Sequence, residues 1–119
     1  MSEAAPRPAH GRADPDLLTG GDVVLDRAAH RVTVDGHAVE LALQEFRLLD
    51  LLMDRADHVV PSMTILESLW GLPFTGDPGT VAVHILRLRK KLDRWDGASR
   101  HVRTVRGIGY VFDTEPSDD

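Results

Sequence analysis

The sequence of 119 residues predicts one α+β domain, and three observations support this prediction. Short segments with alternating apolar and polar residues lie before position 42. Segments with apolar residues at helical spacing occupy most of positions 43–95, and a second alternating pattern near the C-terminus predicts a hairpin. The expected order is three strands, two helices, a loop, a third helix and a hairpin. The chain has no cysteine, which excludes disulfides and thiolate metal sites.

The N-terminal part divides into a tail and a small sheet. Residues 1–20 are rich in Ala, Pro, Gly and charge without periodicity, so we expect a disordered tail or an interdomain linker. The folded domain is expected to span residues 21–114. Strands are predicted over residues 23–26, 30–34 and 37–41. The pair Asp35-Gly36 predicts a hairpin turn, because glycine accepts the positive φ that this turn requires.

Two helices are predicted next. Apolar residues at helical spacing indicate a helix over 43–55, whose cap position Ala42 has no side-chain acceptor, at a cost of about 1 kcal/mol. A second helix is expected from Pro61 to Trp70, since proline is tolerated in a first turn. Residues 71–79 contain two prolines and three glycines and must form a loop.

The third helix, TVAVHILRLRKKLDR over residues 80–94, has an apolar and a basic face. Its apolar stripe comprises Val81, Ile85, Leu88, Leu92 and Trp95. The opposite side carries Thr80, Val83, Leu86, Arg87, Lys90 and Arg94, with His84, Arg89 and Lys91 along its edges. Such a face either keeps a surface helix soluble or binds something negative.

The charge distribution favours a negatively charged partner for this region. The whole chain carries a net charge of −5, but residues 80–110 carry eight Lys/Arg against two acids, leaving −11 for the remainder. Because screening limits the reach of charge to about 8 Å at physiological salt, the local patch matters more than the total.

The last predicted element is a hairpin. Residues 101–105 and 108–112 flank Arg106-Gly107, and Gly107 and Gly109 are expected to allow a tight turn with Arg106 near its tip. Residues 115–119 form an acidic tail that is expected to be disordered.

Four segments then indicate a family. LALQEFRLLDLL, VVPSMTILESLW, TVAVHILRLRKKL and TVRGIGYVF resemble, in order and spacing, the DNA-binding (effector) domain of OmpR/PhoB-type response regulators. The resemblance implies a winged helix-turn-helix with a four-stranded N-terminal antiparallel sheet, three helices and a C-terminal hairpin wing. It implies sequence-specific binding of double-stranded DNA in the transcription regulation of a two-component system. We also expect a cytoplasmic protein, which fits the lack of cysteine, and no cofactor. Loop 71–79 would contact RNA polymerase, and a homodimer would bind tandem half-sites.

The resemblance also implies roles for single residues. Val83, Leu86 and Arg87 would read bases, Arg106 would enter the minor groove, and the remaining predicted contacts, with phosphates or groove edges, are Trp70, Thr80, His84, Arg89, Lys90, Thr104 and Tyr110. Trp70 is equally well explained as a core aromatic, and Tyr110 as a residue that packs the wing onto the core. Nothing in residues 1–20 forms the receiver domain that family members carry, so we expect an excised domain or a stand-alone, differently regulated protein.

Two departures from the family pattern leave a second function open. Ala82 stands where the family commonly has Asp, and Leu86 where it has a polar or basic residue. Val83 and Leu86 therefore form an apolar spot that contacts either thymine methyl groups or a protein. The alternative is a winged-helix protein–protein interaction module with weak or no DNA binding. No catalytic motif, metal-ligand spacing or membrane-length apolar run is present in the sequence.

Overall fold

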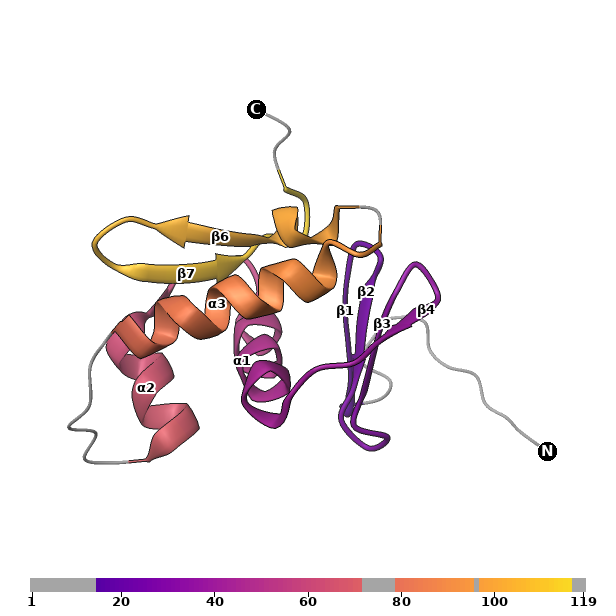
Figure 1. Ribbon diagram of the computed structural model, residues 1–119, viewed down its shortest axis with the longest axis horizontal. Coiled ribbons are helices and arrows are strands. Elements are labelled where there is room, and N and C mark those ends of the chain that lie inside the picture. Colours follow the sequence, from indigo (N-terminus) through magenta and orange to yellow (C-terminus); the bar gives the residue numbers. More distant parts are fainter. Residues whose placement is uncertain (1–14, 72–78, 96, 117–119) are drawn as a thin grey trace.

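The computed structural model describes residues 15–71, 79–95 and 97–116. It shows a four-stranded N-terminal sheet, three helices and a three-stranded C-terminal sheet (Figure 1). This arrangement confirms the predicted α+β winged-helix fold. Among the described residues, no helix is long and apolar enough to cross a membrane. The elements are β1 (Leu17–Gly20), β2 (Val23–Asp26), β3 (Arg31–Val34), β4 (His37–Val39), α1 (Leu43–Asp54), β5 (Val60–Pro61), α2 (Ser62–Trp70), α3 (Gly79–Leu92), the 3₁₀ helix η1 (Ala98–His101), β6 (Val102–Val105) and β7 (Gly109–Phe112).

The N-terminal sheet contains one strand more than the residue patterns indicated. The strands follow the order β1-β2-β3-β4, and each pair is antiparallel. The expectation that disorder extends to Gly20 is wrong for residues 17–20, because they pair with β2. Gly20 is buried against Phe112, and a Cβ there would lie 2.4 Å from a carbon of that ring. The predicted turn is confirmed, with φ of 52° at Asp35 and 81° at Gly36.

Helix α1 lies near the centre of the molecule (Figure 1), and its buried side includes Phe46, Leu49 and Leu52. The missing side-chain cap at Ala42 is also confirmed. The Glu45 carboxylate compensates in part, since it accepts a hydrogen bond of 2.8 Å from the Ala42 backbone N–H.

The segment before α2 differs from the prediction. Pro61 has φ −62° and ψ 147°, so it is extended and precedes the helix, which begins at Ser62. Val60 and Pro61 form the short strand β5, which pairs with Tyr110 and Gly109 of β7. A segment for which no strand is predicted therefore becomes the first strand of the C-terminal sheet, whose order is β5-β7-β6.

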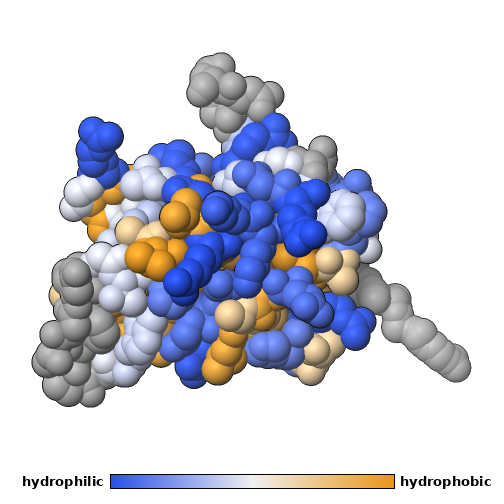
Figure 2. All heavy atoms as spheres, viewed as in Figure 1, coloured by the Kyte–Doolittle hydropathy of each residue, from blue (hydrophilic) through white to orange (hydrophobic). Residues whose placement is uncertain are grey.

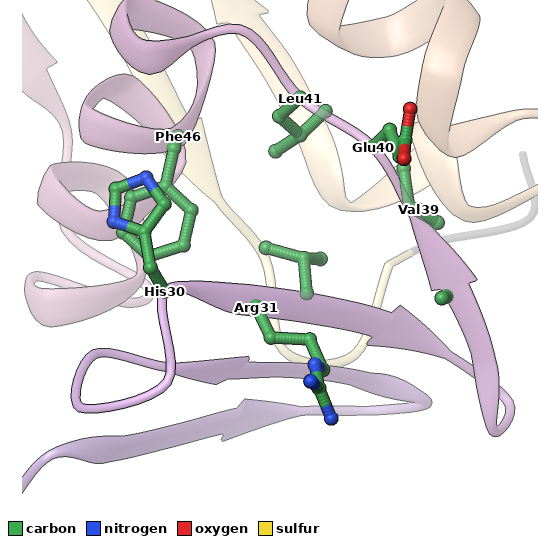
Figure 3. A pocket seen from close by; sticks show the side chains of 8 residues that line it. His30, Arg31, Val39, Glu40, Leu41 and Phe46 are labelled. Atoms are coloured by element: carbon green, nitrogen blue, oxygen red, sulfur yellow. The ribbon is translucent and has the colours of Figure 1, made fainter.

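Three ring stacks join the N-terminal sheet and the C-terminal segment to neighbouring elements. His30 stacks on Phe46 with ring centroids 3.8 Å apart, and Figure 3 shows the two rings face to face beside a small pocket between the sheet and α1. His37 stacks on Trp95 at 4.0 Å. His101, predicted to lie in the terminal hairpin, lies instead in η1, and Phe112 stacks on it at 4.9 Å. The sheet, the helices and the terminal hairpin thus share one core.

Candidate nucleic-acid interface

Helix α3 divides into a buried and an exposed face, as its sequence predicts. Val81, Ile85, Leu88 and Leu92 are at most 1% exposed. The outward side chains are exposed, and they are Ala82, Val83, Leu86, Arg87 and Lys90. Figure 2 shows a hydrophilic surface over α3 with a group of hydrophobic atoms within it. The apolar spot predicted from the sequence is therefore exposed at the surface, with Val83 45% and Leu86 56% exposed.

The N-terminal half of α3 is packed against the end of α2. The Nδ1 atom of His84 lies 2.9 Å from the Thr80 carbonyl oxygen, one helical turn earlier. The His84 ring also meets Trp70 edge-on, at a centroid distance of 5.1 Å. Trp70 is half-buried and packs against the core. The His84 ring therefore lies between the indole of Trp70 and the backbone of Thr80.

Arg89 and Lys91, which lie on the edges of the basic face, both have protein partners. Arg89 donates from Nε to the Val102 carbonyl oxygen at 3.0 Å and from Nη2 to the Thr104 hydroxyl at 2.8 Å. Lys91 donates to the buried Glu45 carboxylate at 2.6 Å. Burial on its own would raise the pKa of Glu45, but the hydrogen bonds from Lys91 and from the Ala42 N–H outweigh it and hold this pKa below its usual value.

The wing is a tight hairpin whose turn spans residues 106–108. Arg106 is exposed there, Gly107 has φ 80°, and Ile108 is 57% exposed. Gly107 therefore has the predicted role. Gly109 does not have a positive φ, so its predicted role in the turn is wrong. It is required because a Cβ at this position would lie 2.1 Å from the Val60 carbonyl oxygen of β5.

Tyr110 and Thr104 face each other across the wing. They are paired in the register of β6 and β7, and Tyr110 is also paired with Val60 on its other side. Tyr110 is half-buried and packs against the core, whereas Thr104 is exposed. At the base of the wing, Arg103 donates to both carboxylate oxygens of Asp113, at 2.7 and 3.2 Å.

The sequence of this chain matches a known protein family. The model described as "Transcriptional regulatory protein, C terminal" matches residues 36–112. The chain belongs to this family. It is accordingly a domain of the OmpR/PhoB type of response regulator, as its sequence motifs predict.

Curated relatives support the same family. The sensory transduction protein RegX3 of Mycolicibacterium smegmatis is 38% identical over 101 residues, which cover 85% of this chain and 44% of the relative. The response regulator protein PmrA of Pseudomonas aeruginosa is 41% identical over 103 residues, covering 87% of this chain and 44% of the relative. The chain thus spans about half the length of the curated relatives that it matches.

Solved structures of family members share the fold. The Klebsiella pneumoniae RstA DNA-binding domain, in complex with RstA box, is 31% identical with a TM-score of 0.73, covering 83% of this chain and 98% of that one. The DNA-binding domain of CpxR from E. coli is 33% identical with a TM-score of 0.71, covering 82% and 95%.

The structure brings most of the predicted site residues onto α3 and the adjoining wing, while Trp70 ends α2. Figure 1 shows the wing alongside α3, with its turn at the end of the molecule where α3 begins. Ile108 is exposed in the wing turn but is not among the predicted contacts.

Proposed function

We propose that this chain binds double-stranded DNA in a sequence-specific manner and thereby serves transcription regulation, with α3 in the major groove. The observation that carries this proposal is the exposed face of α3, where Arg87 and Lys90 project while the opposite stripe is buried. A helix about 10–12 Å in diameter fits a groove about 12 Å wide. The solved complex of the RstA DNA-binding domain with RstA box supports DNA as the partner of this chain.

The wing supplies a second contact in the proposed complex. Arg106 is exposed at the turn and is held there by two strands. A narrow, A·T-rich minor groove has an enhanced negative potential that attracts arginine. We therefore propose that Arg106 enters the minor groove next to the major-groove site, and that Ile108 lies against the sugar edges beside it.

Base readout combines charge with apolar contact. Arg87 is suited to the O6 and N7 acceptors of guanine, whereas Val83 and Leu86 can contact only the C5-methyl group of thymine. Thr80, His84 and Lys90 border this face and are proposed to contact phosphates or groove edges, together with Trp70 and Tyr110. The same apolar spot also favours the second candidate, a module that binds another protein.

Three further proposals concern the surroundings of this site. The folded unit spans residues 17–114, which revises the predicted start. Tandem half-sites about 10 bp apart would seat a homodimer. The loop 71–79 is proposed to contact RNA polymerase, although its residues 72–78 lie outside the described part of the chain.

A selection from random duplexes, run with the intact chain at two salt concentrations, tests the main proposal. We expect enrichment of one sequence motif and an affinity that falls as salt rises, because bound Lys and Arg release counterions. Arg87→Ala should weaken binding by about 10-fold or more and relax the preference at one base pair. Arg31→Ala, which removes an exposed cation from the N-terminal sheet, serves as the matched control and should bind like the unmodified chain.

The outcomes separate the two candidate functions. Affinity that is equal for every duplex and independent of salt contradicts the DNA proposal and favours a protein partner for Val83 and Leu86. Arg106→Ala should weaken binding most on sites with A·T-rich flanks. An unchanged footprint on these flanks would remove the minor-groove role of Arg106 while leaving major-groove binding intact.

A further inference from the structure

We propose that Arg89 is a positioning residue, which sets the wing at a fixed place relative to α3 so that both enter their grooves together. This inference rests on the proposed function and assigns Arg89 a different role from the phosphate contact that its family position implies. It also assigns Thr104 the role of a partner within the protein.

The contacts of Arg89 show how one side chain holds the wing. Its guanidinium donates to the Val102 carbonyl oxygen at 3.0 Å and to the Thr104 hydroxyl at 2.8 Å, which are the first and third residues of β6. A planar guanidinium has donors in a fixed fork, so two simultaneous bonds fix a direction as well as a distance. An ammonium group is a point charge and fixes neither.

The position of β6 makes this bond significant. In the sheet order β5-β7-β6, strand β6 lies at the edge and, within the described part of the chain, pairs only with β7. The other edge of the wing is held through β5, which leads directly into α2. Arg89 holds the opposite edge to α3. The wing is therefore fixed on both sides, and Arg89 provides the bonds to the helix proposed to enter the major groove.

A small movement at Thr104 would displace the wing turn. Arg106 follows Thr104 by two residues, a distance of about 7 Å at the rise of an extended strand. Without the Arg89 bonds, the hairpin can tilt away from α3, and ordering it upon binding costs affinity. The contribution of Arg106 to the affinity for DNA should then decrease even though its own side chain is intact.

Salt dependence distinguishes this positioning role from a phosphate contact. Removal of one phosphate contact changes the slope of log affinity against log salt by about 0.9. Arg89→Lys keeps the charge but loses the fork, and Thr104→Val removes the hydroxyl acceptor without touching any charge. If positioning is the role, both variants weaken binding and reduce this slope although neither removes a charge, because the displaced wing no longer brings Arg106 to the DNA.

The experiment measures the affinity of the intact chain for its selected duplex at several salt concentrations. Arg89→Lys and Thr104→Val should each weaken binding by about 3- to 10-fold, with a slope reduced toward that of Arg106→Ala. Adding Arg106→Ala to Arg89→Lys or to Thr104→Val should weaken binding by a smaller factor than it does in the unmodified chain, because a displaced wing no longer brings Arg106 to the DNA. Lys90→Gln is the matched control on the same helix, and it should reduce the slope and combine additively with Arg106→Ala.

Three results would overturn the inference while leaving DNA binding established. These are wild-type affinity in both variants, an unchanged slope in Thr104→Val, and losses of affinity that simply add to that of Arg106→Ala. If the unmodified chain binds no duplex, the proposed function itself fails. Thermal unfolding of each variant checks the fold, and the conservative Thr104→Val change keeps the test decisive if Arg89→Lys unfolds.

Discussion

Replacing Gly109 by alanine should separate the wing from β5. The added Cβ would lie 2.1 Å from the Val60 carbonyl oxygen and 2.8 Å from the Pro61 Cα. Ordinary contact at these atoms begins near 3.4 Å, and backbone cannot rotate away as a flexible side chain can. Strands β5 and β7 must therefore move apart by more than 1 Å, which exceeds what their hydrogen bonds tolerate.

The size of the effect follows from these contacts. Overpacking in a well-packed site costs about 1–3 kcal/mol. Each backbone hydrogen bond lost between β5 and β7 adds about 1 kcal/mol. We therefore expect Gly109→Ala to lower the free energy of unfolding by about 2–5 kcal/mol. Gly107→Ala is the control, because its surroundings are open and only its φ of 80° is unfavourable, at about 1–2 kcal/mol.

Urea unfolding followed by tryptophan fluorescence measures both variants. Hydrogen exchange at the Ser62 amide reports on the β5 region directly, since this N–H donates to the Ile108 carbonyl oxygen at 3.1 Å. In Gly109→Ala we expect this amide to lose protection. If the variant is no less stable than Gly107→Ala and the Ser62 amide stays protected, the argument from close approach is wrong.

Three other changes have defined outcomes. Glu45→Gln should lower the free energy of unfolding by about 1–2 kcal/mol at neutral pH, because the charged partner of Lys91 is lost. The folded protein holds the pKa of Glu45 below its ordinary value of 4.5, so this stabilisation is fully present above pH 4.5 and is lost as the pH falls through the lowered pKa. The free energies of unfolding of the unmodified chain and of Glu45→Gln, measured by denaturation, should therefore converge at low pH. Leu86→Arg should raise general affinity for duplexes and alter the selected motif, whereas a binding assay showing neither change would indicate that this face meets a protein. Asp57→Ala should lower the melting temperature, because Asp57 accepts hydrogen bonds of 2.9 and 2.8 Å from the Thr114 backbone and hydroxyl, and an unaltered melting curve would show that these bonds are not needed.

The helices were predictable because their apolar spacing is regular. The stripe from Val81 to Leu92 is buried as predicted, and α1 and α3 each begin within one residue of their expected starts. Strand β1 was not predictable from its four residues, LLTG, which lack alternation and follow a Pro-rich tail. Its pairing with β2 and the burial of Gly20 under Phe112 are tertiary effects that local sequence does not encode.

The sequence predicts which face of α3 carries the candidate site, but not which residues the side chains at its edges bind. Helical periodicity places Arg89 and Lys91 at the edges of the basic face, yet it cannot reveal that Val102 and Thr104 accept from one of them. It also cannot reveal that Glu45, 46 residues away in sequence, accepts from the other. Arg89 and Lys91, which the sequence predicts at the edges of the basic face, therefore form hydrogen bonds within the protein.

The bond between Arg89 and β6 has a consequence for solubility. An edge strand with free carbonyl and amide groups is a template onto which a strand of another molecule can add. Arg89 occupies the Val102 carbonyl with a charged group, so this edge is obstructed by the helix beside it. The same side chain that orients the wing therefore protects the molecule from aggregation through that edge.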